Sequence, residues 1–298
     1  MSSKHIGIYH LIRPQNEQLP AIESFLATHA ESSMFIRSNF KSAGLAFEGR
    51  DFQGEYLVTL DGSGQVNGVF VHYWNGTLMM QAPDLELLGA LIERFKEQVT
   101  RPVSAIIGPA AQVSHTIEAL SLNGKGYSTN AIEGLYALKL SALSKERLAN
   151  NYQVVPAHAA DRELLTRWLK SYEIEALGRT DSPELDVHVE DRVSRMIENS
   201  SAWVMLAAGI PVSLSGFNAR LPEMVQVGPV WTPPEQRGQG HARHLVSETL
   251  RMAAAEGVKK SILFTDNPAA IRAYQAIGFT RIGEYQLAML REAVEITS

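Results

Sequence analysis

The residues best suited to bind an anion lie together in one glycine-rich segment, Arg237-Gly238-Gln239-Gly240-His241-Ala242. An apolar, β-prone run over residues 224–232 leads into this segment, and Pro233 and Pro234 end the strand because neither can donate to a sheet ladder. Apolar residues at helical spacing follow, at Ala242, Leu245, Val246, Leu250 and Ala253. The first N–H groups of a helix lack internal partners and lie at the positive end of its dipole. With the forked cation of Arg237, they predict a phosphate or pyrophosphate site.

The spacing within this segment differs from that of two other phosphate-binding loops. There is no Gly-x-x-x-x-Gly-Lys-Ser/Thr sequence, so the chain has no Walker loop. The third glycine of the Rossmann fingerprint is also missing. An ordinary tight turn between a strand and a helix is the alternative to an anion site. The pattern Arg-x-x-Gly-x-Ala, at Arg237, Gly240 and Ala242, resembles the acyl-CoA pyrophosphate loop of the GNAT superfamily of N-acyltransferases.

A second motif downstream strengthens this resemblance. Residues 261–265 have the pattern of a buried strand, and residues 266–279 follow as a short helix with its flanks. The family shows Asn-x-x-Ala-x-x-x-Tyr-x-x-x-Gly-Phe here, which this chain matches at Asn267, Ala270, Tyr274, Gly278 and Phe279. The two motifs stand in the family's order, each between a strand and a helix, and the resemblance covers about the second half of the chain.

The resemblance implies acetyl-CoA as co-substrate and assigns roles to individual positions. In the family, the fourth strand splays from the fifth and pairs with the pantetheine arm. This implies that Val230 and Thr232 contact that arm through their backbone groups. It also implies that a backbone N–H near Val230 or Trp231 polarises the thioester carbonyl. Trp231 itself is expected to serve mainly in packing. The implied CoA-binding residues are Val230, Trp231, Thr232, Arg237, Gly238, Gln239, Gly240, His241, Ala242 and Asn267.

Tyr274 is the catalytic residue that the resemblance implies, because a tyrosine here points its hydroxyl at the CoA sulfur in the family. A thiolate leaving group benefits from a proton donor, and unperturbed tyrosine and thiol pKa values are about 10 and about 8.5. The alternative is a core tyrosine, since Tyr274 lies three residues after Ile271 on a short apolar helix. We favour the catalytic role.

Other polar residues admit more than one role. Asn267 has two possible roles, to which we give equal weight. It is a good helix N-cap before Pro268, and in the family the asparagine at this position contacts the CoA arm. His241 and His244 lie three apart on one helix without further metal ligands in the pattern, so we expect no metal, and His241 should supply only its backbone N–H. No motif marks a general base among the polar candidates Glu173, Glu175, His188, Glu190, Glu223 and Gln226.

The composition of the chain fits an enzyme of this kind. Its residues are 45% hydrophobic and 20% charged, as in ordinary globular proteins, and its length of 298 residues is enough for two globular domains. The net charge of −5 and the lack of a basic block argue against nucleic-acid binding. The absence of cysteine removes thiolate nucleophiles and cysteine-based zinc sites. Residues 1–6 lack the apolar core of a signal peptide and no segment is apolar enough to span a membrane, so we expect a cytoplasmic protein.

The elements that must position these residues occur twice along the chain. Helical patterns over 161–172 and 187–198 precede a hairpin of strands over 202–207 and 212–217, and then the glycine segment. In the first half, strands over 55–60, 66–73 and 77–81 precede a helix over 84–98, a strand over 105–107, a helix over 109–120 and a closing strand over 135–140. The sequence therefore predicts an α/β fold of two tandem GNAT-like domains, 1–143 and 152–298. Each would be a mixed, mostly antiparallel, twisted sheet flanked by helices.

The first half lacks the residues that carry the chemistry. Where the glycine loop should fall it reads Gln81-Ala82-Pro83-Asp84-Leu85-Glu86, whose acidic residues would repel a pyrophosphate at the helix start. His115 stands where Tyr274 would be. We interpret the first half as a degenerate copy; an inserted domain of unrelated origin is the alternative.

The sequence thus predicts an N-acetyltransferase active in its second half. It would transfer an acetyl or other acyl group from acyl-CoA to a primary amine, by direct attack in a ternary complex. The acceptor, a small molecule or a peptide, is not identified, and the oligomeric state stays open. A non-catalytic CoA-binding or scaffold protein and a generic phosphate-binding domain are the rival hypotheses.

Overall fold

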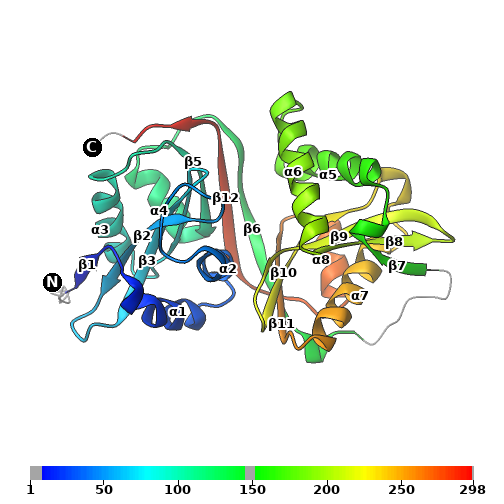
Figure 1. Ribbon diagram of the computed structural model, residues 1–298, viewed down its shortest axis with the longest axis horizontal. Helices are drawn as coiled ribbons and strands as arrows, with labels where there is room; N and C mark the ends of the chain where they lie inside the picture. The colour runs from blue at the N-terminus through cyan, green and yellow to red at the C-terminus, as the bar shows by residue number, and fades with distance from the viewer. Residues whose placement is uncertain (1–8, 145–151, 297–298) are drawn as a thin grey trace. The chain divides into compact units, whose positions relative to one another are not determined.

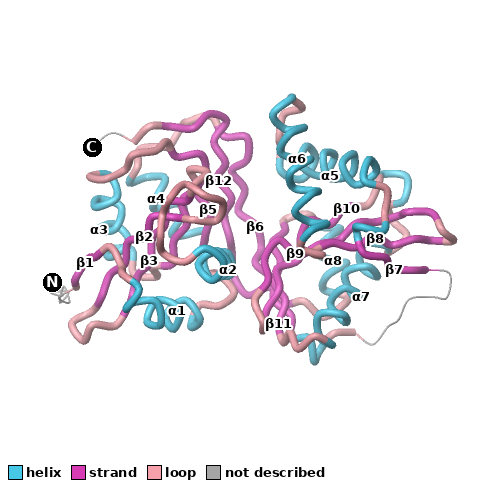
Figure 2. Tube along the Cα trace, in the orientation of Figure 1, coloured by secondary structure: helices cyan, strands magenta, loops and turns pink. Residues whose placement is uncertain are grey.

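The computed structural model describes residues 9–144 and 152–296. Residues 1–8, where the sequence lacks the core of a signal peptide, and residues 145–151, which the predicted domain boundary spans, lie outside the described residues. The chain divides into two compact units, the first of Met1–Glu133 with Glu284–Ser298 and the second of Gly134–Gly283. Each unit contains a sheet with helices on its faces (Figure 1; Figure 2).

The first unit is built on a mixed sheet. Its elements are β1 (His10–Ile12), α1 (Leu19–Thr28), α2 (Met34–Ala43), β2 (Gly54–Leu60), β3 (Val66–Tyr73), β4 (Thr77–Gln81), α3 (Leu85–Lys96), β5 (Val103–Pro109), α4 (Ala110–Ala119), the start of β6 (Tyr127–Lys139) and most of β12 (Thr280–Val294). The strand order is β1-β2-β3-β4-β5-β12. β4 and β5 are parallel, whereas the pairs β1–β2, β2–β3, β3–β4 and β5–β12 are antiparallel.

Apolar side chains on both faces of β3 explain why helices cover this sheet on two sides. Val69 and Val71 pack in the same cluster as Ile22 of α1, on one face. Phe70, which points the other way, packs in the cluster that contains Leu88 of α3. A strand buried on both faces carries a nearly continuous apolar run, as β3 does.

The second unit repeats this architecture. Its elements are the end of β6, β7 (Tyr152–Pro156), α5 (Arg162–Leu177), α6 (Pro183–Glu198), β8 (Ala202–Ala207), β9 (Ile210–Arg220), β10 (Met224–Trp231), α7 (His241–Ala255), β11 (Lys260–Thr265) and α8 (Pro268–Gln275). The strand order is β6-β11-β10-β9-β8-β7, with only β10 and β11 parallel among the described pairs. α5 and α6 bury their apolar residues in one cluster, and α7 and α8 in another.

The two units share one order of elements. The series α1-α2-β2-β3-β4-α3-β5-α4 of the first unit matches α5-α6-β8-β9-β10-α7-β11-α8 of the second. In both, the only parallel pair among the described pairings joins the two strands on either side of the third helix of the series. This confirms the predicted fold class, α/β in two tandem units whose sheets are mixed and mostly antiparallel.

The strands after α4 and α8 pair in a way that the sequence does not reveal. The strand predicted to close the first half ends in residues 134–139 of β6, which pair antiparallel with β11 of the second unit. The last strand of the chain, β12, pairs through Tyr285–Met289 with β5 of the first unit. Each unit therefore takes one of its strands from the other half of the sequence. The origin of the halves by duplication, with domains 1–143 and 152–298, stays a prediction.

Two short strands were missed, and several element ends differ from the predicted ones. β1 and β7 are edge strands of three and five residues, too short for an alternating pattern to stand out. α6 begins at Pro183, before the predicted start, because the Ser182 hydroxyl accepts the N–H of Leu185 and proline suits the first helical position.

Candidate functional site

The second unit contains a parallel strand pair that separates along its length. β10 and β11 pair at Met224–Lys260, Val225–Ser261 and Gln226–Ile262. β10 continues to Trp231 and β11 to Thr265, but the two strands are not paired beyond Gln226 and Ile262. Parallel strands end at the same edge of a sheet, so the segments that follow both strands lie at this opening. These segments are the glycine loop and α8.

The glycine loop has the backbone geometry of an anion site. Gly238 and Gly240 both have positive φ, 79° and 80°, which side-chain-bearing residues rarely adopt. α7 begins directly after Gly240, and its first helical bond runs from the N–H of His244 to the carbonyl of Gly240. Among the described backbone hydrogen bonds, none uses the N–H groups of residues 238–242. These donors lie at the N-terminus of a 15-residue helix, where an anion is favoured.

The Arg237 side chain lies against neighbouring groups of the same unit. Its Nε donates to the carbonyl of Thr232 at 2.9 Å, and its Nη2 lies 2.9 Å from Oε1 of Glu175 on α5. Its guanidinium also stacks 4.9 Å from the ring centre of Trp231. Arg237 and Glu175 are both exposed, so this ion pair is one that a ligand can replace at low cost.

The other residues assigned to the loop and strand have clear local contacts. The buried ring of Trp231 packs with Leu214 and Val204 in the cluster under α5 and α6, as expected for a packing residue. The Thr232 hydroxyl bonds to that of Ser213 at 2.9 Å. His241 is buried beside Tyr152, with ring centres 5.6 Å apart, and burial followed by the charge of His244 lowers its pKa. A buried neutral imidazole leaves the backbone N–H as the group that His241 offers to an anion.

Asn267 acts as the N-cap of α8. Its Oδ1 accepts the N–H groups of Ala269 at 2.9 Å and Ala270 at 3.2 Å. Pro268 occupies the first helical position, as the sequence predicts. The cap is therefore made, and a further contact from Asn267 to the CoA arm stays a prediction.

Tyr274 lies in the core that α7 and α8 share with the sheet. Its side chain is 8% exposed, and its ring lies edge-on to Phe279 with centres 6.0 Å apart. Burial, with a smaller contribution from Tyr172 of α5, raises the pKa of Tyr274 well above its usual value. The hydroxyl therefore keeps its proton at physiological pH, which a proton donor requires and a core residue also allows.

Three of the carboxylates considered as general bases form ion pairs. Glu173 lies buried between α5 and α6 in contact with Arg192, Arg179 and His188. Glu190 pairs with Arg162, and Glu175 with Arg237. Although burial acts to raise it, the pKa of Glu173 is lowered by its neighbours His188, Arg192 and Arg179, so this carboxylate is a weak base. The sequence does not reveal the ion cluster around Glu173, because its members are up to 19 residues apart, on α5, on α6 and in the loop between them.

The first unit has the same strand pair but fills the corresponding positions with its own groups. Asp84 caps α3, and its carboxylate accepts the N–H of Glu86 at 2.9 Å. The Oε1 atom of Gln112 on α4 accepts the N–H of Ala82, just after β4, at 2.8 Å. A carboxylate thus stands at the helix start where the second unit offers free N–H groups. This arrangement agrees with a degenerate first half.

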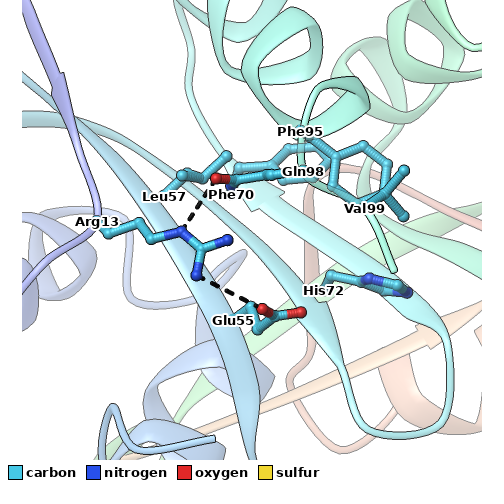
Figure 3. Close-up of a pocket in the computed structure, with 8 residues that line it drawn as sticks. All are labelled: Arg13, Glu55, Leu57, Phe70, His72, Phe95, Gln98 and Val99. Carbon is cyan, nitrogen blue, oxygen red and sulfur yellow. Dashed lines mark hydrogen bonds and ion pairs between the residues drawn. The ribbon is translucent and has the colours of Figure 1, made fainter. Parts of the chain in front are cut away.

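The first unit has a small cavity on the sheet face below α3 (Figure 3). Its wall is formed by His72 and by four apolar side chains, Leu57, Phe70, Phe95 and Val99. Arg13 lies across its rim, where its Nε donates to Gln98 at 3.0 Å and its Nη1 forms an ion pair with Glu55 at 3.7 Å. The space is about that of one water molecule. It is far too small for a cofactor such as CoA.

Within residues 9–144 and 152–296, no three His, Asp or Glu side chains come together as a metal site. In the same part of the chain, no helix is long and apolar enough to cross a membrane.

Comparisons with known proteins agree with this geometry. Residues 163–279 match the model of the acetyltransferase (GNAT) family. A GCN5-related N-acetyltransferase from Sphaerobacter thermophilus is similar in structure, with a TM-score of 0.59, 15% identity and coverage of 97% of this chain and 98% of that one. A tandem GNAT protein from the clavulanic acid biosynthesis pathway is also similar in structure. Its TM-score is 0.56 and its sequence identity 13%, and the match covers 98% of this chain and 100% of that one.

A further match is an acetyltransferase from the GNAT family of Colwellia psychrerythraea, with a TM-score of 0.51, 16% identity and coverage of 96% and 100%. At such identities the structural matches show the fold alone. No curated protein sequence matches the chain. From the family match and the fold together, residues 163–279 form an acetyltransferase (GNAT) family domain, in a chain with the tandem GNAT fold.

Proposed function

We propose that the protein is an acyl-CoA-dependent N-acyltransferase whose active site lies in the second unit. The observation that carries this proposal is the opening between β10 and β11, with the N-terminus of α7 at the same edge. The opening exposes backbone groups of β10 to an extended ligand arm, and the glycine loop offers N–H groups to a pyrophosphate. Acyl-CoA has both features, an amide-bearing arm and a pyrophosphate.

The proposed reaction is direct acyl transfer, with acetyl as the acyl group. A neutral primary amine attacks the thioester carbonyl carbon, the C–S bond breaks, and the amine loses a proton to solvent through ordered water. A backbone N–H of β10 near Val230 would stabilise the developing oxyanion. Tyr274 would donate its proton to the CoA thiolate and regain one from solvent; its raised pKa keeps the hydroxyl protonated before the transfer, although it also makes the hydroxyl a weaker acid. Binding both substrates side by side supplies much of the rate gain.

The acceptor is proposed only as a class, a primary amine on a small molecule or a peptide. The test is release of free CoA thiol from acetyl-CoA over a panel of such amines, with the Gly240→Val variant as the matched control. Valine cannot easily adopt the positive φ of Gly240. We expect amine-dependent thiol release from the wild type and none from the variant.

The same samples separate the rival hypotheses. CoA binding by calorimetry with no transfer to any amine would favour a non-catalytic CoA-binding protein. Equal affinity for ADP and CoA would favour a generic phosphate-binding domain, because a CoA site also uses the pantetheine arm. We expect CoA to bind more tightly than ADP.

A further inference from the structure

Two irregularities lie next to each other in the β9–β10 pair. Gln226 pairs with Ala219, but Val227 pairs with Phe217, so Asn218 is an extra residue on β9. Val230 then pairs with Ser215, so two residues of β10, Gly228 and Pro229, lie opposite one residue of β9. Bulges bend a strand and re-aim its groups. The bulge in β10 comes directly before Val230, in the part of the strand that has separated from β11.

Asn218 connects these two bulges. Its Nδ2 lies so close to Gly228 that a Cβ atom on Gly228 would overlap it. Its Oδ1 accepts a hydrogen bond from Nη2 of Arg192 on α6, at 2.8 Å. The side chain of the extra residue on β9 is thus held by a helix on one side and pressed against the bulge of β10 on the other.

Arg192 is itself fixed at its other end. Its Nη1 donates to Oε1 of Glu173 on α5, a carboxylate that is 1% exposed. Arg179 and His188 also contact Glu173, at 3.4 Å and 3.7 Å. Burial alone would raise the pKa of Glu173, but the His188 hydrogen bond and the charges of Arg192, His188 and Arg179 lower it. Glu173 is therefore a charged, buried anchor for Arg192.

We propose that Arg192 is a positioning residue for acyl transfer: by holding Asn218 against Gly228, it fixes the β10 backbone at Val230 and Trp231, where the thioester carbonyl is polarised. The inference rests on the proposed function and adds to it a residue outside the glycine loop and the α8 motif. Arginine suits this role because its planar fork reaches two acceptors at once, here on α5 and β9. A small displacement of a group that positions the substrate lowers the rate of the chemical step strongly, so the contact from Arg192 through Asn218 to Gly228 should matter for catalysis.

The first test compares Arg192→Gln, Asn218→Ala and the double variant with the wild type. Each single substitution breaks the same link, so each should lower kcat by about 10- to 100-fold. The affinity for CoA should stay within about twofold, since the pyrophosphate contacts lie in another segment. The double variant should be no slower than the slower single variant, because the two changes remove one shared interaction.

The matched control is Arg162→Gln. Arg162 also joins α5 to α6, through an exposed pair with Glu190 at 3.1 Å, but it has no described contact with β9. Its loss should leave kcat unchanged. An equal fall in kcat for Arg162→Gln would show that any loosening of the two helices matters and would overturn the inference.

A second measurement keeps the test independent of catalysis and of stability. Arg192→Gln leaves Glu173 buried with one cation fewer, which costs stability, whereas Asn218→Ala leaves the ion cluster intact. Amide hydrogen exchange at Val230 and Trp231 in the free protein should be faster in Asn218→Ala and unchanged in Arg162→Gln. Unchanged exchange, kcat within twofold of wild type, or additive effects would each overturn the inference. A wild type that binds CoA but acylates no amine would overturn the proposed function instead, and the exchange measurement would still decide whether the link exists.

Discussion

The Arg237 guanidinium lies 2.9 Å from the Glu175 carboxylate, although Arg237 is the residue whose position in the motif points to a pyrophosphate. Both side chains are about half exposed, and such pairs contribute about 0–1 kcal/mol. An incoming pyrophosphate would therefore meet a cation that is pre-oriented by Thr232 and only weakly held by Glu175.

The first prediction follows from this relationship. Arg237→Glu should weaken CoA binding by at least about 10-fold, because it removes a charge-assisted donor and adds a second carboxylate beside Glu175. Glu175→Gln, the control, should leave binding unchanged or tighten it by up to about fivefold, since it removes the competitor. Calorimetric titration with CoA measures both, and equal affinity of Arg237→Glu and wild type would rule out the assigned role.

The second prediction concerns stoichiometry. CoA should bind once per chain, because the Asp84 carboxylate already caps α3 and Gln112 already bonds to the N–H of Ala82. Calorimetry should give a ratio near one, and Gly240→Val should abolish all binding. A ratio near two, or binding that survives Gly240→Val, would show that the first unit binds CoA as well.

The third prediction is a pH dependence of stability that originates at His72. Burial, followed by the charge of Arg101, lowers the pKa of His72 from 6.5 to about 4. Between about pH 6.5 and 4, His72 therefore binds a proton in the unfolded chain but not in the folded chain. The stability of the folded state falls as the pH drops through this range. At 1.36 kcal/mol per pKa unit, the loss is about 3 kcal/mol.

Thermal unfolding between pH 7 and 4 measures this loss. His72→Leu should flatten the decline, whereas His158→Gln, which changes an exposed histidine, should leave its slope as in the wild type. An unchanged slope in His72→Leu would contradict the role of His72.

The sequence predicted the parts of the site that are local in the chain. The glycine loop, the Asn267 cap and the acidic start of α3 each depend on neighbouring residues, and propensity rules describe such features well. The contact of Arg192 with Asn218 and the pairing of β6 with β11 join residues far apart in the chain. A single sequence contains no pattern that specifies those partners, so they emerged only from the fold.

The fourth prediction follows from that strand exchange. Tyr136 and Leu138 of β6 are buried in the core of the second unit, 4% and 2% exposed, and their strand pairs with β11. A fragment of residues 152–298 lacks these side chains and exposes the edge of β11, so it should be poorly folded and prone to aggregate. A fragment of residues 134–283 retains both and should unfold cooperatively. Circular dichroism and size-exclusion chromatography compare the two, and equal stability of the fragments would contradict the importance of β6.

The last prediction concerns Tyr274. If its hydroxyl protonates the leaving thiolate, Tyr274→Phe should lower kcat by about 10²–10⁴-fold where proton transfer limits the rate, with little change in CoA affinity. The ring remains to pack against Phe279, so the melting temperature should move little. Because burial raises the pKa of Tyr274 well above 10, the wild-type rate should show no loss attributable to this group as the pH rises to 10.

Steady-state rates with the acceptor found in the amine panel, combined with CoA titration, test this role for Tyr274. Phenylalanine keeps the ring of tyrosine and lacks only its hydroxyl, so the Tyr274→Phe change separates the role of the hydroxyl from the packing of the ring. A kcat within about twofold of wild type, with chemistry shown to limit the rate, would reduce Tyr274 to a core residue. A large drop in melting temperature with no specific loss of kcat would point to a structural hydrogen bond instead. The pH profile distinguishes a third case. If the rate declines as the pH rises toward 10 in the wild type but not in Tyr274→Phe, the hydroxyl loses its proton far more easily than its burial allows.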